Sequence, residues 1–495
     1  MTITRRELLK GIGSLGLVAR VSPLVANDAP VLVDTPRLIG SSKVMLVDHE
    51  FIAKSGGVRL KLHPPRKTGE RLIESQHTWE SATLNWFSVL RDGDRYRMWY
   101  ECYDVEGWPT ADDTSFCYAE STDGIRWTKP QLGLVSYRGN KDNNILFRQV
   151  GEGKHRSRVH GSGVFIDPSV PPEARYKCVS QGLFQGIGDR PHYVAGMTSR
   201  DGLRWTRTPQ PICPVFVDSQ YSGFWDLQQQ RYVIVGRVSG RGGRAIGRST
   251  SVHFDRFAPF TRVLETDEHD PPESDLYNPA CQQYPGSPGL YLMFPSLFRH
   301  REDSLDIRLA VSRDGVKWTR PDRETSFIPL GQPLDFDGGS LYMGNGGCLR
   351  TGNELSFYFS GSTLKHGEVG LENLTDPKKR RVISRAVARP DRLVSVTAGK
   401  TGGRFETPLI RFAGDRLVVN ASARPGGDVR VGLLDAEGRP IPGRGVTECA
   451  VRSDDKESWT VSWADGPGVA RLSEQSIRLR IELRDADVFG FQFEG

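Results

Sequence analysis

Short runs of apolar or alternating residues, separated by turn sequences, make up most of the chain. The runs come in pairs: 85–90 precedes 95–101 across Asp92-Gly93-Asp94, and 347–350 precedes 354–360. Three further pairs lie between them, at 163–166 and 175–180, 223–225 and 231–237, and 280–284 and 289–294. Runs of this length bounded by Gly, Asp, Asn and Pro are typical of antiparallel strands joined by tight turns. The pattern therefore predicts an all-β fold with five small sheets.

A seven-residue string, S-x-D-G-x-x-W, recurs three times after predicted strands. The copies occupy 121–127, 199–205 and 312–318, and 249–254 is a degraded fourth copy. Irregular spacing with strands between the copies is typical of a β-propeller and not of a solenoid. The Asp and Gly suit a tight turn and the Trp can pack across it, so we interpret the motif as structural.

The predicted fold is a five-bladed β-propeller over residues 36–399, followed by a β-sandwich over 400–495. The second unit is indicated by alternating runs at 416–420, 428–434 and 478–483. A propeller commonly completes its last blade with a strand from the other terminus. We therefore expect residues 36–42 and the strand 43–51 to close the ring.

The composition and charge of the chain exclude several classes of protein. The 495 residues are 37% hydrophobic and 25% charged, and no apolar run is long enough to span a bilayer, which describes a soluble globular protein. The net charge of +6 is partly contributed by the N-terminus, so the rest of the chain lacks the basic stripe of a nucleic-acid-binding protein. Seven cysteines are widely spaced without C-x-x-C, which argues against a zinc or redox motif. Cys102 and Cys117 are the nearest pair for a disulfide.

The N-terminus has the pattern of an export signal. Arg5 and Arg6 are followed by Lys10 and a short, glycine-containing apolar run from Gly11 to Ala19. This pattern predicts a twin-arginine signal peptide over residues 1–26, with an amphipathic N-terminal helix as the alternative. The expected location is periplasmic or secreted. No lipobox cysteine follows, so the sequence predicts no membrane anchor.

Several strings carry a resemblance to a known family. They are 118–130, which contains the first S-x-D-G-x-x-W copy, Lys141-Asp-Asn-Asn-Ile145, Ser274-Asp-Leu-Tyr277, 291–295 and 481–493. The chain resembles a family of exported bacterial proteins, frequent in planctomycetes, that are regarded as five-bladed-propeller glycosyl hydrolases. It is more distantly similar to glycoside hydrolase families 32 and 43. Their N-D-P-N-G and E-C-P strings are absent, so catalytic candidates are taken from strand placement.

Carboxylates stand at the starts of the predicted inner strands. Inner strands line the centre of a propeller, so acids at their starts converge at one end. We select Glu80, Asp218 and Asp275, with Asp48 as the rival of Glu80. Glycoside hydrolysis needs two such groups, one protonated and one ionised. The alternative for each is an acid that caps a turn or strand.

Other side chains near the same strand ends are candidate sugar contacts. They are His160, Glu101, Arg299, His300 and His366, together with Trp79, Trp86 and Trp108 as aromatic platforms. For each of them, the alternative is a role in packing or at the surface. Glu101 faces either the centre or the blade surface, because a shift of the strand register by one residue turns a side chain to the other face. The sequence indicates no cofactor and no metal ligand set, and it leaves a central calcium ion open.

These features predict an exported glycoside hydrolase that acts on a polysaccharide or oligosaccharide. The alternative is a carbohydrate-binding propeller without catalysis. A sialidase is disfavoured, because its Asp-box usually carries a residue between Asp and Gly and because no arginine cluster is evident along the chain. The sequence leaves the sugar, the linkage and the oligomeric state open.

Overall fold

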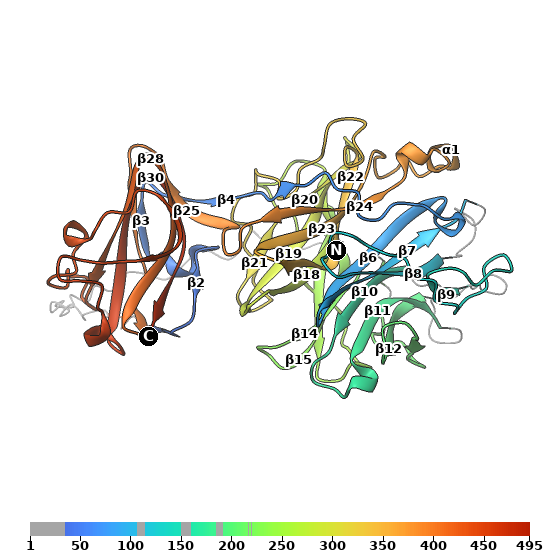
Figure 1. The fold of residues 1–495 in the computed structure, drawn as a ribbon, viewed down its shortest axis with the longest axis horizontal. Coiled ribbons are helices and arrows are strands. Elements are labelled where there is room, and N and C mark those ends of the chain that lie inside the picture. Colours follow the sequence, from blue (N-terminus) through green and yellow to red (C-terminus); the bar gives the residue numbers. More distant parts are fainter. Residues whose placement is uncertain (1–34, 106–113, 150–159, 185–191, 216, 219) are drawn as a thin grey trace, which may run out of the picture.

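The computed structural model describes residues 35–105, 114–149, 160–184, 192–215, 217–218 and 220–495 (Figure 1). The predicted signal peptide and Trp108 lie outside these residues. Within them, strands are the main secondary structure, and the only α-helix is the single turn α1 (Leu371–Leu374). No helix in the described ranges has the length and apolar character to cross a membrane. The all-β prediction is confirmed.

Antiparallel sheets follow one another along the chain, and single parallel pairs, Leu305 with Ser340 and Asn345 with Ser88, join the first, fourth and fifth. The first contains β6 (Thr83–Asp92), β7 (Arg95–Tyr103), β8 (Thr114–Ser121) and β9 (Ile145–Gln149), and the second contains β10 (His160–Ile166), β11 (Tyr176–Leu183), β12 (His192–Ser199) and β13 (Thr206–Arg207). The third contains β14 (Ser222–Asp226), β15 (Arg231–Gly240), β16 (Gly243–Ser251) and β17 (Thr261–Leu264). The fourth contains β18 (Ser274–Tyr284), β19 (Ser287–Arg299), β20 (Ser304–Ile307) and β21 (Ala310–Ser312). The fifth contains β22 (Ser340–Thr351), β23 (Glu354–Ser362), β24 (Val382–Ala388) and β5 (Arg66–Lys67).

The first strands of these sheets form a closed series. β6 contacts β10, β10 contacts β14, β14 contacts β18, β18 contacts β22, and β22 contacts β6. Polar side chains join neighbours: Ser88 Oγ accepts from the backbone N–H of Val164, and the Asn345 amide donates to the carbonyls of Ser162 and Tyr221. Because the sheets are antiparallel, first strands begin where second strands end and third strands begin. We call this the strand-start end.

The repeated motif forms turns at the opposite end. In the first copy, Asp123 Oδ1 accepts from the backbone N–H groups of Ile125 and Arg126, and Trp127 Nε1 donates to the Gly124 carbonyl at 3.2 Å. Burial alone would raise the pKa of Asp123, but these hydrogen bonds lower it to about 2. The φ of Gly124 is 74°, a conformation that favours glycine. Tyr358 of the fifth sheet donates to the same carbonyl, so the turn also joins two sheets.

The segment expected to close the ring lies elsewhere, and that prediction is wrong. β1 (Arg37–Gly40) pairs with β27 (Ile410–Phe412), and β2 (Val44–Met45) pairs with β30 (Ser476–Glu494). The strand that completes the fifth sheet is β5. The physical reason is burial: Val44, Met45, Leu46 and Val47 are consecutive and all buried, whereas an outermost strand has an exposed face.

The C-terminal unit is built around two long strands, β28 (Arg416–Leu434) and β30. β30 pairs with β28, β25 (Val394–Ala398), β26 (Gly403–Glu406) and β27, and β28 also pairs with β29 (Asp455–Thr460). Two N-terminal strands, β3 (Lys54–Gly56) and β4 (Arg59–Leu62), pair with β26 and β25. Figure 1 shows the blue β3 beside the red strands on the left, and β4 near the orange β25 between this unit and the ring on the right.

A continuous apolar core joins the two units. One buried cluster contains Met45 and Val394 of the C-terminal unit together with Leu292 and Val311 of the fourth sheet. The Tyr284 hydroxyl donates to Asp391 at 2.7 Å across the same boundary. The units therefore share a core instead of being joined by a linker alone.

Candidate functional site

Asp275 lies at the start of β18 and is fully buried. Its Oδ2 atom accepts from the backbone N–H of Arg244 at 3.1 Å and from the Arg244 guanidinium at 3.0 Å, and it lies 3.1 Å from Nε2 of His300. A Cβ at position 243 would come within 2.9 Å of this oxygen, so Gly243, whose φ is 123°, allows the close approach of β16. The Oδ1 atom is buried and has no hydrogen-bond partner among the described residues. The carboxylate is thus held by one oxygen and leaves the other for a ligand.

Asp218 precedes β14 at the same strand-start end and forms an ion pair with Arg237 of β15. Its side chain is 41% exposed, whereas that of Asp275 is 0% exposed. Asp218, Arg237 and Arg244 line one cavity of about 460 Å³. Asp218 is therefore the more solvent-accessible of these two carboxyl groups.

Three aromatic rings from different first strands contact one another beside the two carboxylate–arginine pairs. Trp86 of β6 is stacked on Tyr277 of β18, with centroids 6.3 Å apart, and meets Tyr342 of β22 edge-on at 4.9 Å. The Cζ atoms of Arg244 and Arg237 lie 4.9 Å and 5.5 Å from the Tyr277 ring centroid. Both carboxylate–arginine pairs therefore converge on Tyr277, which is only partly buried.

Glu101 and His160 form a second polar group near the centre. Glu101, at the end of β7, is fully buried; its Oε1 accepts from the backbone N–H of Ser162, and its Oε2 lies 3.4 Å from Nδ1 of His160. The same nitrogen is 3.2 Å from the Tyr103 hydroxyl, and the His160 ring lies 6.5 Å from that of Trp86. Glu101 therefore faces the neighbouring sheet and the centre.

Buried polar atoms without a partner gather on the first strands and beside them. Of the 16 such atoms among the described residues, seven lie there: Trp86 Nε1, Glu101 Oε2, Ser162 Oγ, Gln220 Nε2, Asp275 Oδ1, Asn278 Oδ1 and Asn345 Oδ1. Buried polar atoms are nearly always hydrogen bonded in folded proteins, and exceptions call for an explanation such as a ligand or water. The concentration at the centre marks this region as the candidate site.

Glu80 and Trp79 do not belong to this group. Both lie in the short 3-10 helix η2 (Thr78–Glu80) and are buried against the first sheet. Glu80 accepts from backbone N–H groups of the preceding turn, from the Tyr100 hydroxyl, and from Lys129 Nζ at 2.8 and 2.9 Å. Trp79 Nε1 donates to Asn144 at 3.1 Å. These contacts are those of a packed aromatic and a satisfied buried ion pair.

Asp48 lies at the opposite end of the ring from Asp275. Its carboxylate accepts from the backbone N–H of Glu50 and from the guanidinium of Arg313, which follows β21. Arg313 also donates to the Met45 carbonyl at 2.8 Å. Asp48 thus joins the N-terminal segment to the fourth sheet.

We expect Asp48→Asn to lower stability without changing substrate turnover. The change removes one charge of a largely buried ion pair, which costs about 1–3 kcal/mol when the partner remains. The melting temperature from circular dichroism should fall while the turnover per folded molecule stays at the wild-type value. A large loss of turnover at an unchanged melting temperature would return Asp48 to the catalytic candidates.

Of the other sequence candidates, His300 and His366 lie beside the Asp275 group, whereas Arg299 pairs with Asp306 at 3.0 Å. The His366 ring is 4.9 Å from Tyr277. Burial lowers the pKa of His366, and the charges of Arg244, Arg381 and Arg237 lower it further, while Asp303 opposes them. These arginines were missed from the sequence. Their signal is position, because Arg237 lies near the end of a second strand while Arg244 and Arg381 lie at the starts of third strands.

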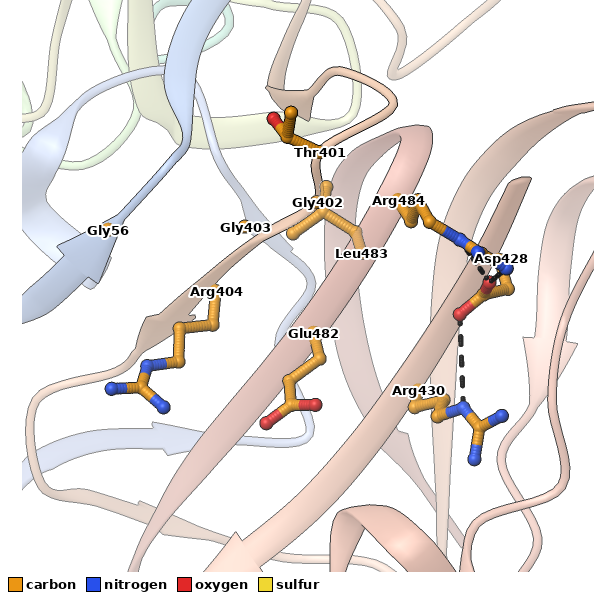
Figure 2. A pocket seen from close by; sticks show the side chains of 10 residues that line it. All are labelled: Gly56, Thr401, Gly402, Gly403, Arg404, Asp428, Arg430, Glu482, Leu483 and Arg484. Atoms are coloured by element: carbon orange, nitrogen blue, oxygen red, sulfur yellow. Dashed lines mark hydrogen bonds and ion pairs between the residues drawn. The ribbon is translucent and has the colours of Figure 1, made fainter.

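A larger groove, of about 650 Å³, lies on the C-terminal unit (Figure 2). Figure 2 shows Arg404, Glu482 and Arg430 side by side on neighbouring strands, and Asp428 bonded to Arg484. None of the ten lining residues is aromatic. The groove therefore lacks the stacking surface that sugar rings use, and the ring centre remains the better candidate.

The structure also shows the state of the cysteines. All seven cysteines are buried and unbridged, and the Sγ atoms of Cys102 and Cys117 lie 3.5 Å apart. Burial raises the pKa of the Cys102 thiol. In the described ranges no three His, Cys, Asp or Glu side chains are grouped as metal ligands.

The comparisons find similar solved structures but no sequence family. No family model matches the chain, and no curated protein matches it. The structure of a glycoside hydrolase is 15% identical over 66% of this chain and 93% of its own, with a TM-score of 0.45. A thermostable family-43 glycoside hydrolase is 13% identical over 64% and 93%, with a TM-score of 0.42. The exo-inulinase of Aspergillus awamori is 13% identical over 88% and 99%, with a TM-score of 0.43. Similarity at this level does not decide the function.

Proposed function

We propose that this chain is a glycoside hydrolase that cleaves a polysaccharide or oligosaccharide at the strand-start end of a five-bladed β-propeller. The closed series of contacts between first strands supports the propeller, and the pairings of β28 and β30 support a C-terminal β-sandwich. The observation that carries the function is the convergence of two carboxylates, Asp218 and Asp275, with their arginines, on the partly buried ring of Tyr277.

The two carboxyl groups have different environments, and hydrolysis requires two different roles. Asp275 is excluded from solvent and fixed by Arg244 and His300, so it serves as the ionised group that acts as base or nucleophile. Asp218 is partly exposed and lines the cavity, so it exchanges protons with solvent and protonates the leaving oxygen once Arg237 turns away. Tyr277 and Trp86 supply faces on which a sugar ring stacks.

The proposed enzyme is exported and works without a cofactor. Residues 1–26 act as a twin-arginine signal, so the folded protein is exported to the periplasm or beyond. The reaction needs no cofactor, because two carboxyl groups and water suffice for glycoside hydrolysis. Two assays test this setting: location in cell fractions with and without an Arg5→Lys, Arg6→Lys signal, and activity before and after dialysis against a chelator.

A second candidate is a carbohydrate-binding propeller without catalysis. One observation favours it: each of the two carboxylates faces an arginine, so the structure offers no carboxyl group that is visibly held protonated.

The test is release of reducing ends from a panel of purified polysaccharides by the full-length protein. We expect release from at least one of them, and loss of release in Asp275→Asn. Retention on a polysaccharide affinity gel, with no reducing ends from any substrate that binds, would establish the binding module instead.

A further inference from the structure

Near the centre of the ring lies a partly buried arginine whose charge has no carboxylate partner among the described residues. Arg381 directly precedes β24 and contacts Tyr342, with its Cζ atom 4.5 Å from the ring centroid. Its Nη1 atom is buried without a hydrogen-bond partner. Within the described part of the chain, it forms no ion pair with a carboxylate. Burial lowers its pKa, with opposing contributions from Tyr342 and Tyr277.

An arginine of this kind is costly. Arginine cannot be neutralised by losing a proton in a protein, so an enclosed guanidinium group without an opposite charge is destabilising. An unsatisfied buried polar atom such as Nη1 calls for an explanation, and a ligand of opposite charge is one. The guanidinium is also the side chain best shaped for two parallel hydrogen bonds to a planar oxyanion.

Arg381 is part of a cluster of three arginines. The positive charges of Arg244, Arg381 and Arg237 all act on the half-buried imidazole of His366. Asp275 is bonded to Arg244, and Asp218 is bonded to Arg237, which leaves the charge of Arg381 unmatched.

The next carboxylate, Asp303, does not supply that missing charge. Its Oδ2 accepts from the backbone N–H of Gly367 at 2.7 Å, and its Oδ1 lies 3.9 Å from His366 Nδ1.

We infer that the site recognises an acidic sugar, whose carboxylate or sulfate group binds Arg381 beside Tyr277 and Tyr342. The inference rests on the proposed function for the position of the scissile bond, but the recognition of the anion does not depend on hydrolysis. The aromatic rings contact the face of the sugar, and the charge of the guanidinium fixes the position of the acidic sugar in the site. The arginine cluster that the sequence did not reveal is therefore assembled by the fold from β15, β16 and the residue before β24.

The experiment measures binding, so it stays separate from turnover. Isothermal titration calorimetry compares oligogalacturonides, a sulfated galactan oligosaccharide and a neutral galactan oligosaccharide of similar length, using full-length protein carrying Asp275→Asn to prevent hydrolysis. We expect an acidic probe to bind at least tenfold more tightly than the neutral one. The two acidic probes distinguish a carboxylate from a sulfate ester as the source of the charge.

Substitution of Arg381 tests the residue itself. In Arg381→Met we expect affinity for the preferred acidic probe to fall about 10- to 100-fold, because a charge-assisted hydrogen bond is lost, while affinity for the neutral probe stays the same. The melting temperature should not fall, since an unpaired buried charge is removed. Arg381→Lys, which keeps the charge, should retain part of the preference. Arg439→Met, which removes the arginine of a solvent-exposed ion pair with Asp435, is the matched control.

The opposite results would overturn the inference. They are a wild-type site that binds neutral and acidic probes equally, or an Arg381→Met protein that keeps the full acidic preference. If the acidic preference is present and depends on Arg381 while the protein without Asp275→Asn releases no reducing ends, the hydrolase proposal fails and the anion site stands.

Discussion

Replacing Asp275 with asparagine will lower turnover about 10²–10⁴-fold and leave the fold intact. Asparagine has the same size and keeps one oxygen to accept from Arg244, so the packing around β18 is retained. The variant loses the ionised oxygen that faces the centre, and a general acid or base contributes about that factor to catalysis. Initial rates of reducing-end release at saturating substrate measure the effect, and circular dichroism checks the fold.

Asp218→Asn and Glu80→Gln are informative partners for this variant. Asp218→Asn should lose turnover steeply as well, because hydrolysis needs both carboxyl groups. Glu80→Gln removes the partner of Lys129, so it should lower the melting temperature and leave turnover per folded molecule unchanged. If Asp275→Asn and Asp218→Asn both hydrolyse at the wild-type rate, these carboxylates are structural.

Much of the fold could be predicted from the sequence because its information is local. Each strand pair is bounded by its own turn residues, and the S-x-D-G-x-x-W turn is held by bonds within a few residues, such as Asp123 to Ile125 and Arg126. The closing strand could not be predicted in this way. Arg66–Lys67 is too short to form a pattern, and 43–51 looks like a strand in either unit. The place of residues 43–51 depends on their burial against strands that are distant in the sequence.

The candidate site was predicted where position along a strand decides it. Asp275 and Asp218 follow from the rule that first strands start at one end of the ring. Trp79 and Glu80 also directly precede a first strand in the sequence, but the 3-10 turn of η2 directs them into the core of the first sheet. Arg381 escaped notice because the rule considered only first strands, whereas third strands also begin at this end. Only the assembled fold shows that its charge has no partner.

Ending the chain after Gly399 will prevent formation of a soluble, folded protein. The truncation removes β30, which pairs with β2 and with β25, and β25 in turn pairs with β4. Buried side chains on strands that pair with β30, including Met45 and Val396, would then face solvent. At about 25 cal/mol per Å² of apolar surface, exposing even a few hundred Å² costs several kcal/mol, which is comparable to the total stability of a domain.

Size-exclusion chromatography of the soluble fraction tests this result, with thermal melts of any material recovered. The full-length chain should elute as a folded species, and the truncated chain should be found in the insoluble fraction or the void volume. Arg439→Met, a change on the outer surface of the same unit, should behave like the wild type. A monomeric truncated protein with wild-type melting and turnover would contradict this prediction, because it would show that the ring folds and works without the C-terminal strands.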